Sequence, residues 1–284
     1  MNNEELERAI LGFAAKYGGR YRTKFYALAI EGNHIQGTAL FPGANRAFFM
    51  RDFNSSVARA IPRYVSRYPG GKFWGRRYSS EVLPNGDDIE EWFFYTVLQP
   101  VQDGLVPKIS EYPGYNCFHD AVWGIERKFK LVNWGAYNAR KRFDASVNWR
   151  DFIEVHTLKY ERLPGYEHLS QKEYAELMHK KLEERRVKIV AERLAKGLGF
   201  LGRDALLRIQ PGATPKSTKR STDTSHRPRV LSVCPVRRQE CLAWYFEIYF
   251  KYKEASKEYR SGNLDIEFPQ GTYPPWRERM PLAA

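Results

Sequence analysis

The stretch KFYALAIEGNHIQGTALF, residues 24–41, decides the fold that we predict for this chain. Residues 24–30 are mainly aromatic, branched or small and carry no helix-capping signal, which favours a β-strand. Glu31-Gly32-Asn33 has the composition of a tight turn, and residues 34–41 return as a second strand. The stretch therefore predicts an antiparallel β-hairpin.

Helical patterns lie on both sides of the hairpin in the sequence. Apolar residues recur at helical spacing through residues 3–17, and we expect that helix to end at Gly18-Gly19. Residues 44–67 predict a second helix, which Pro62 should bend or end because proline lacks the backbone N–H that a helix interior needs.

Two further elements complete the first hundred residues. Residues 72–83, KFWGRRYSSEVL, predict another strand. Residues 87–98 predict a helix that begins with acidic residues, which suit the helix dipole, and stops at Pro100. The order helix, strand, strand, helix, strand, helix predicts an α+β fold with helices packed against an antiparallel sheet.

The chain changes character near residue 120, where we place a domain boundary. Residues 120–160 and 171–197 are predicted to be helical, as are residues 236–261. The predicted organisation is a first domain at 1–120, a helical basic region at 121–210, a flexible Pro/Ser/Thr/Lys linker at 211–230, and a C-terminal helix and tail at 231–284.

Charge follows the same division. The 284 residues carry a formal net charge of +13, and the sequence pI is about 9.6. Residues 1–120 are almost neutral, with 14 Lys and Arg against 13 Asp and Glu, which leaves 32 against 20 for the remainder. An excess of this size favours a polyanionic partner, most often nucleic acid, although a role in solubility alone stays open.

Other classes of protein are excluded or disfavoured. No run approaches the ~18 apolar residues that a membrane span needs. The start, MNNEELERAI, has the composition of neither a signal peptide nor a transit peptide. Three cysteines (Cys117, Cys234, Cys241) are too few for a disulfide framework. We therefore expect a cytoplasmic, nucleoid-associated protein without a membrane partner.

His34 and Gln36 are the first candidate site residues. Residues two apart on a strand project to the same face, so an imidazole and an amide would lie side by side. An imidazole nitrogen and an amide oxygen can together hold a divalent cation. A pair of polar surface residues without a ligand is the alternative.

Tyr95 and Gln99 are the second candidates. They are four residues apart, so they stack on one face of the predicted helix, beside its apolar stripe. A tyrosine can act as a covalent nucleophile where a metal polarises the group that it attacks. A tyrosine that only packs against the sheet is the alternative.

A third candidate is the predicted strand at residues 72–78. Its alternation would place Lys72, Trp74, Arg76 and Tyr78 on one face. Aromatic rings interleaved with cations suit single-stranded nucleic acid, because rings stack on bases and cations meet phosphates. An edge strand whose charges prevent aggregation is the alternative.

Four stretches taken together resemble a known family. They are AIEGNHIQ (29–36), GKFWGRRYSS (71–80), YTVLQPVQDGLV (95–106) and EYPGY (111–115). In this order they are similar to the HUH single-tyrosine transposases, particularly the REP-associated tyrosine transposases, over residues 3–118. Gln-Pro-Val followed by Gly-Leu-Val is the most specific part of the resemblance.

The resemblance implies a fold. It is a ferredoxin-like antiparallel sheet with helices on one face, followed here by a mainly helical basic extension. The family sheet has a strand before its first helix, whereas this chain begins directly at the helix.

The resemblance also implies roles for residues. Tyr95 would attack a DNA phosphate to give a 5′-phosphotyrosine and a free 3′-OH. His34 and Gln36 would bind Mg²⁺ or Mn²⁺, with Gln99 completing the metal shell. Gln36 stands where the family has its second histidine, which should weaken metal binding. The DNA-binding residues would be Lys72, Trp74, Arg76, Arg77 and Tyr78.

Three functions follow from these observations. The first is a metal-dependent tyrosine transposase or nuclease that cleaves and rejoins single-stranded or hairpin DNA, as a monomer or homodimer. The second is a catalytically inactive or domesticated DNA-binding protein derived from such a transposase. The third is a basic globular protein without a nucleic-acid role.

Overall fold

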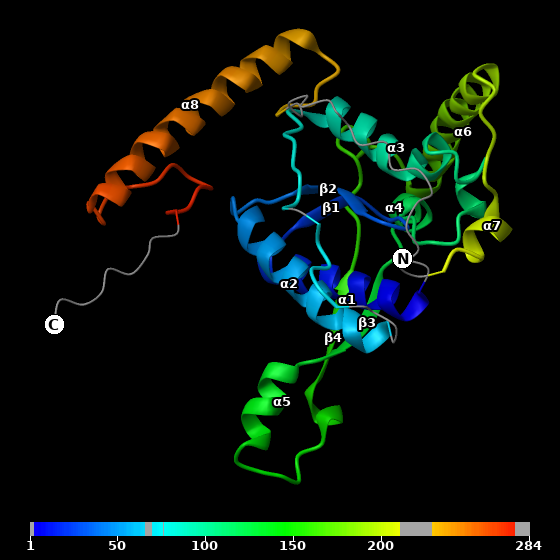
Figure 1. Ribbon diagram of the computed structural model, residues 1–284. Helices are drawn as coiled ribbons and strands as arrows, with labels where there is room; N and C mark the ends of the chain where they lie inside the picture. The colour runs from blue at the N-terminus through cyan, green and yellow to red at the C-terminus, as the bar shows by residue number, and fades with distance from the viewer. Residues whose placement is uncertain (1–2, 66–69, 76, 211–228, 276–284) are drawn as a thin grey trace.

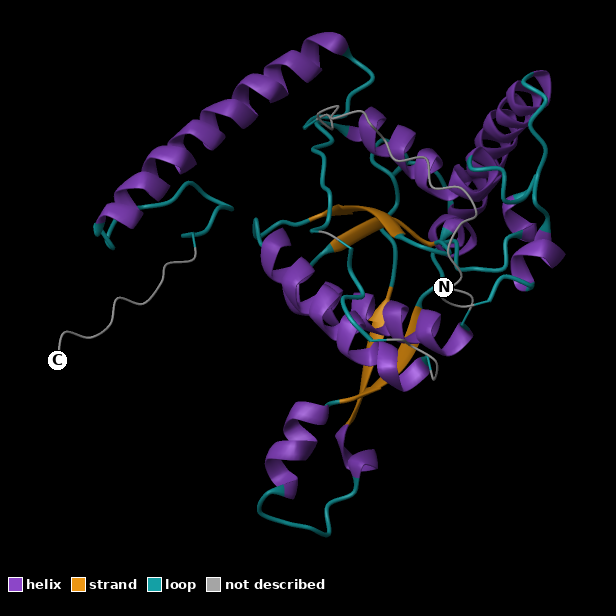
Figure 2. Cartoon of the chain, in the orientation of Figure 1, coloured by secondary structure: helices purple, strands orange, loops and turns teal. Residues whose placement is uncertain are grey.

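The computed structural model describes residues 3–65, 70–75, 77–210 and 229–275, and the fold is α+β (Figure 1, Figure 2). Its elements, in chain order, are α1 (Glu4–Tyr21), β1 (Lys24–Ile30), β2 (Ile35–Leu40), α2 (Arg46–Tyr64), α3 (Gly86–Gln102), the short 3-10 helix η1 (Ile109–Glu111), α4 (Phe118–Trp123), β3 (Arg127–Val132), α5 (Trp134–Lys141), the 3-10 helix η2 (Trp149–Phe152), β4 (Ile153–Leu158), α6 (Gln171–Ala195), α7 (Arg203–Leu207) and α8 (Pro235–Ser261).

The predicted hairpin is confirmed. β1 and β2 pair antiparallel, from Lys24 opposite Leu40 to Ile30 opposite Ile35. Every residue of β1 after Lys24 is buried. The connecting turn is closed by the backbone N–H of Glu31, which donates to the carbonyl of His34 at 2.9 Å.

The second edge of β1 is also covered. The N–H of Ile30 donates to the carbonyl of Tyr115 at 2.9 Å, and the N–H of Cys117 donates to the carbonyl of Leu28 at 3.1 Å. Further along, the N–H of Glu161 donates to the carbonyl of Phe25 at 2.7 Å. β1 is therefore the central strand of the molecule, with backbone partners on both edges.

Helices cover both faces of the hairpin, not one face as expected. Figure 2 shows α3 on one side of the sheet and α1 and α2 on the other. On the α2 side, the ring of Phe49 lies 5.9 Å from that of Phe25 and 5.5 Å from that of Phe41. On the other side, α3 contributes fully buried Phe93 and Val97. Both faces of β1 are apolar, so both need a covering layer.

Two predicted helix ends are wrong. α1 runs through Gly18-Gly19 to Tyr21. Gly18 serves close packing, because a Cβ there would lie 2.7 Å from the Phe25 ring. α3 runs through Pro100 to Gln102. A proline removes one N–H donor, and here Pro100 is buried in the packed part of the helix, where tertiary contacts outweigh that loss.

The prediction of a helix around Pro62 is confirmed, since α2 contains this proline and ends two residues later, at Tyr64.

The predicted strand at residues 72–83 is wrong. Only Val82 forms a bridge, with Val230, and the remainder of the described segment has no strand conformation. The indole N–H of Trp74 donates to the carbonyl of Asn54 in α2 at 2.8 Å. The segment therefore alternates in sequence without forming a strand, and Trp74 contacts α2 while Lys72 and Arg77 are exposed.

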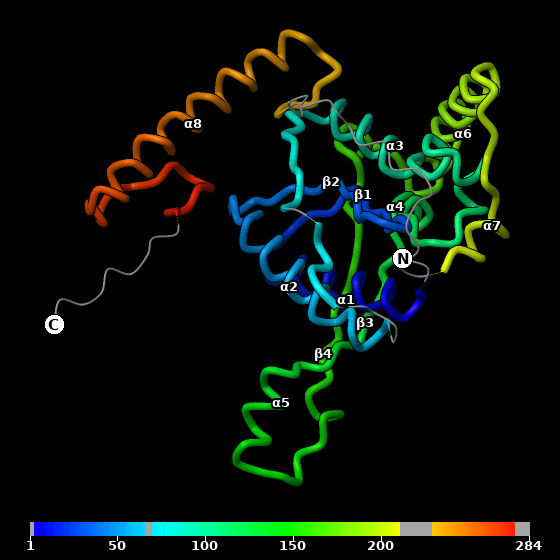
Figure 3. Tube along the Cα trace, viewed as in Figure 1, coloured from blue at the N-terminus to red at the C-terminus, as the bar shows by residue number. Residues whose placement is uncertain are grey.

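Residues 120–160 also differ from the prediction, which made them helical. β3 and β4 pair antiparallel along their whole length, and α5 and η2 lie between them. Figure 3 shows the α5 end of this part of the chain projecting from the core. We call residues 127–158 the basic arm, because this segment contains seven Lys and Arg but only three Asp and Glu.

The long C-terminal helices are confirmed. α6 begins with a capping box, in which the Ser170 hydroxyl accepts from the Glu173 N–H and the Glu173 carboxylate accepts from the Ser170 N–H. α8 lies apart from the core (Figure 1). Of the predicted linker, residues 211–228 lie outside the described residues.

One hydrophobic core joins the two sides of position 120. It extends from Leu6 in α1 to Leu182 in α6 and includes Phe129 of β3 and Leu158 of β4. Across the described part of the chain, no helix is both long enough and apolar enough to cross a membrane.

Candidate functional site

The turn of the hairpin and one face of α3 carry the candidate site. Tyr95, Gln99 and Asp103 follow one another at four-residue spacing, so they occupy successive turns along one face of the helix. Glu31 and His34 stand at the two ends of the hairpin turn. We call these five residues the turn–α3 cluster.

Electrostatic interactions connect the hairpin turn with α3. The charge of Asp103 raises the pKa of Glu31, His34 and Tyr95. Glu31 also raises the pKa of Tyr95. Because α3 packs against β1 and β2, residues that are more than sixty positions apart in sequence lie on adjoining elements, and His34, Tyr95 and Gln99 are three of the predicted site residues.

His34 is held by its neighbours in the turn. Its Nδ1 lies 2.8 Å from the Oδ1 of Asn33, and its Nε2 lies 3.9 Å from the Oε2 of Glu31. Burial lowers the pKa of His34, and the negative charge of Asp103 acts in the opposite direction but is the smaller effect. The ring is therefore neutral at neutral pH.

Glu31 is the most buried member of the cluster. Its side chain is 3% exposed, and Oε1 has no hydrogen-bond partner. Burial, aided by the charge of Asp103, raises the pKa of Glu31 to about 7. Tyr112, whose hydroxyl donates to the Ile30 carbonyl at 3.1 Å, helps to close this end of β1.

Tyr95 is half-buried on α3, with its ring 4.6 Å from that of Trp92. Burial raises the pKa of Tyr95, as do the charges of Asp103 and Glu31, while a hydrogen bond with the Gln99 side chain lowers it. The phenol is consequently neutral, and a positive charge in the cluster would make its ionisation easier.

Gln99 connects the tyrosine to the end of the helix. Its Nε2 donates to the Oδ1 of Asp103 at 3.0 Å, while its buried Oε1 has no partner. The cluster thus contains two buried acceptor oxygens without donors, one from Gln99 and one from Glu31. Unsatisfied buried acceptors are costly, and each of these two calls for a partner such as a water or an ion.

The donor set fits a hard divalent cation. Carboxylate and amide oxygens with a neutral imidazole are ligands that Mg²⁺ or Mn²⁺ accepts. Among the described residues, no three His, Cys, Asp or Glu side chains are grouped closely enough to hold a metal ion. A cation in this cluster would therefore need an amide oxygen as well as Glu31 and His34.

Gln36, predicted as the partner of His34, lies opposite Ala29 in β2 and is half-buried. The side chain that faces the Nε2 of His34 is Glu31.

The predicted DNA-binding residues do not share a strand face. Lys72 and Arg77 are exposed and Tyr78 is half-buried, all in the connection between α2 and α3. Trp74 turns toward α2, as described above. Arg76 lies outside the described residues.

Glu31 and Asp103 were missed by the sequence analysis. Glu31 was interpreted as part of the turn, although it directly follows a fully apolar strand. Asp103 repeats the spacing of Tyr95 and Gln99, and it would have been found if the helix had been continued past Pro100.

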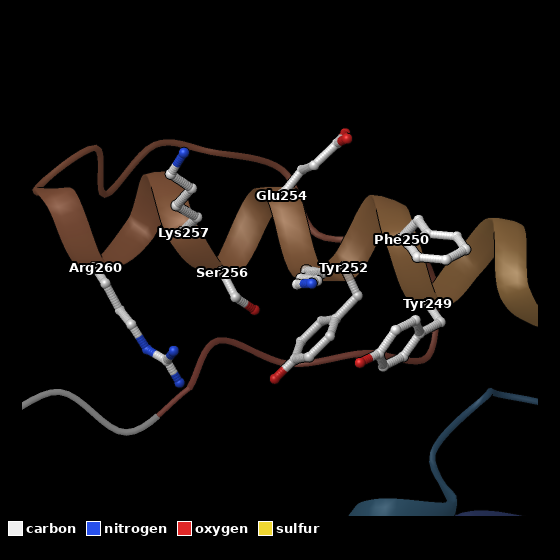
Figure 4. Close-up of a pocket in the computed structure, with 8 residues that line it drawn as sticks. Tyr249, Phe250, Tyr252, Glu254, Ser256, Lys257 and Arg260 are labelled. Carbon is white, nitrogen blue, oxygen red and sulfur yellow. The ribbon is translucent and has the colours of Figure 1, made fainter.

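A separate hollow lies along α8 (Figure 4). Tyr249, Tyr252 and Arg260 extend from one side of the helix. Phe250 and Lys257 extend from the other side. No residue of the turn–α3 cluster lines it.

Comparison with protein-family models, with curated proteins and with solved structures gave no match for this chain.

Proposed function

We propose that this chain is a metal-dependent tyrosine transposase or nuclease that acts on single-stranded or hairpin DNA. The observation that carries the proposal is the packing of α3, which bears Tyr95 and Gln99, against the hairpin whose turn bears Glu31 and His34, with Glu31 acting electrostatically on Tyr95. The resemblance to the HUH single-tyrosine transposases, and with it a ferredoxin-like ancestry for the sheet, belongs to this proposal.

Tyr95 is the nucleophile in this proposal. Its phenolic oxygen bonds to the phosphorus of a DNA phosphodiester, the bond to the 3′ oxygen breaks, and the phenolic proton is transferred to that leaving oxygen through solvent. The products are a 5′-phosphotyrosine and a free 3′-OH, which allows the strand to be rejoined by reversal.

The other proposed site residues would hold the metal that polarises the phosphate and would position the DNA strand. His34, Gln36 and Gln99 would hold Mg²⁺ or Mn²⁺, which would stabilise negative charge on the attacked phosphate. Gln99 also hydrogen-bonds with Tyr95, which favours the phenolate. Lys72, Arg77 and Tyr78 lie on the connection that leads into α3 and are available to contact the strand.

The decisive experiment is to trap the covalent product. Purified protein is incubated with Mn²⁺ and a pool of end-labelled hairpin oligonucleotides with single-stranded flanks, and adducts are resolved on a denaturing gel. We expect an adduct with the wild type and none with Tyr95→Phe. Tyr137→Phe, which alters a tyrosine of the basic arm, is the control. Absence of any adduct with the wild type would contradict the proposal.

A second function is favoured by one observation. The pKa of Tyr95 is raised, which is opposite to the change that an activated nucleophile needs. In a catalytically inactive DNA-binding protein, salt-sensitive binding of the same oligonucleotides would persist in the wild type and in Tyr95→Phe, and neither would form an adduct.

A further inference from the structure

Glu31 is buried at a position where a carboxylate is unfavourable without a partner. The side chain is 3% exposed, and Oε1 has no hydrogen-bond partner. Burying an unpaired carboxylate costs several kcal/mol as an order of magnitude, and native proteins pair such groups or use them as ligands. The other oxygen, Oε2, faces the ring of His34.

The orientation of His34 makes this contact unusual. Asn33 presents its Oδ1, an acceptor, to the Nδ1 of His34 at 2.8 Å, so Nδ1 carries the proton of the neutral ring. Nε2 therefore turns a lone pair toward the Oε2 of Glu31 at 3.9 Å. When Glu31 is ionised, two acceptors face each other at a distance too long for a hydrogen bond.

A third unpaired acceptor lies on α3, the helix that packs against the hairpin. The Oε1 of Gln99 is buried without a partner, while the Nε2 of that amide is held by Asp103 at 3.0 Å. The orientation of the amide is thereby fixed, with its free oxygen left for another group. One nitrogen and two oxygens without donors are what a bound cation would satisfy.

We propose that Glu31 is a direct ligand of the divalent cation, together with the Nε2 of His34 and the Oε1 of Gln99. This inference rests on the proposed function for the presence of a metal, and it assigns the second anchoring ligand to Glu31 in place of Gln36. A carboxylate contributes negative charge that the neutral Gln36 amide lacks, so it is the stronger ligand for Mg²⁺ or Mn²⁺.

The first test measures metal binding directly and without DNA. Free Mn²⁺ is titrated by electron paramagnetic resonance against the full chain and three variants, Glu31→Gln, Gln36→Ala and Glu161→Gln. We expect Glu31→Gln to weaken Mn²⁺ binding at least about tenfold and Gln36→Ala to weaken it less. Glu161→Gln is the matched control, since Glu161 is half-buried at the opposite end of β1 and should bind like the wild type.

The second test uses thermal stability, which separates a ligand from a structural carboxylate. Because the glutamine is neutral, Glu31→Gln should unfold at a higher temperature than the wild type in the absence of metal. Saturating Mn²⁺ should raise the unfolding temperature of the wild type and leave that of the variant nearly unchanged. A purely structural Glu31 would give a variant that is less stable with and without metal.

The outcomes distinguish this inference from the proposed function. Equal Mn²⁺ affinity in Glu31→Gln and the wild type, or a wild type that binds Mn²⁺ no better than the variant His34→Ala, overturns the role of Glu31. If Glu31→Gln loses Mn²⁺ binding but the wild type forms no DNA adduct, the assignment of Glu31 as a ligand is supported and the proposed transposase activity is rejected.

Discussion

At the scale of single residues, Glu7 shows how burial makes a charge depend on pH. This carboxylate lies in α1 and accepts the backbone N–H of Tyr115 at 2.8 Å, next to the edge of β1. Burial is the main cause that raises the pKa of Glu7, and the hydrogen bond from Tyr115 only partly opposes it. The folded state therefore binds this proton more tightly than the unfolded state.

A prediction follows for the variant Glu7→Gln. Because the pKa of Glu7 is raised in the folded state, its contribution to stability is fully present below pH 4.5 and is lost as the pH rises through the folded pKa. Glutamine is neutral and can still accept from Tyr115. The two proteins should have similar unfolding temperatures at pH 4, and the variant should be the more stable at pH 7.

Differential scanning calorimetry between pH 4 and pH 8 measures this difference. Glu5→Gln, at an exposed position of the same helix, serves as the control and should follow the wild type at every pH. A wild type that gains stability relative to Glu7→Gln as the pH rises would show that the hydrogen bond outweighs burial.

At the scale of elements, α3 owes its position to α6. Lys181 contacts Glu90 at 2.7 Å and Arg185 contacts Glu91 at 2.6 Å. At the other end of α3, Arg193 donates to the carbonyl of Gln102 at 2.7 Å and so caps the helix. The helix that carries Tyr95 is thus fixed at both ends by the helix that follows the basic arm.

Gly104 makes that cap possible and gives the second prediction. Its φ is +73°, and a Cβ would lie 1.9 Å from the Nη2 of Arg193. Gly104→Ala should lower the free energy of unfolding by about 1–2 kcal/mol, because alanine is strained in the left-handed backbone conformation. The free energy of unfolding should fall further because the Arg193 side chain must move away from the new Cβ. Gly197, with φ +68° and open space around it, isolates the backbone effect.

Urea unfolding of Gly104→Ala and Gly197→Ala measures the two costs. The difference between them reports the displacement of Arg193. Equal destabilisation of the two variants would mean that Arg193 contributes nothing to the anchoring of α3.

The elements also show what the sequence could predict. The hairpin at residues 24–41 and helices α6 and α8 are encoded locally, by turn residues and by periodicity, and the structure confirms them. The pairing of β3 with β4 joins residues between 21 and 31 positions apart, from Val132 with Ile153 to Arg127 with Leu158, and local periodicity in 120–160 does not reveal it. Alternation at residues 72–83 was misleading because, among the described residues of this segment, only Val82 has a β-bridge partner, Val230.

The candidate site shows the same limit. Tyr95, Gln99 and His34 were predicted from residue type, spacing and the family resemblance, and their roles stay a proposal. Glu31 could not, since its significance is its burial, and burial depends on Tyr112 and the segment that covers the second edge of β1. The sequence supplies the reactive groups, whereas their environment comes from distant parts of the chain.

At the scale of the whole molecule, several parts of the described chain project from the core, and the basic arm has the highest concentration of positive charge among them. Arg140, Lys141 and Arg142 are exposed at the end of α5, and exposed Phe143 follows them. Arg150 lies 4.9 Å above the ring of Trp149. Cations beside exposed rings suit a single-stranded polyanion.

The third prediction concerns this arm. The triple variant Arg140→Ala, Lys141→Ala, Arg142→Ala should bind single-stranded DNA more weakly, with a salt dependence shallower by about 0.7 per lost phosphate contact. Fluorescence anisotropy between 50 and 300 mM salt measures both quantities. The unfolding temperature should stay unchanged, because no residue of α5 is buried.

A second triple variant provides the control for net charge. Lys180, Lys188 and Lys196 are exposed along α6, and replacing all three with alanine removes the same charge. If both triple variants lose the same affinity and the same salt dependence, the arm has no special role and total charge alone governs binding.

The double pairing of β1 has a consequence for how the protein is made. The strand leaves the ribosome early, but the residues that cover its second edge, 115–117 and 161, are synthesised about 90 to 130 residues later. Until then the nascent chain exposes an apolar strand with one open edge, which is the kind of surface that chaperones shield and that aggregates recruit. Slow synthesis after residue 120 would therefore lower the yield of folded protein more than slow synthesis after residue 210.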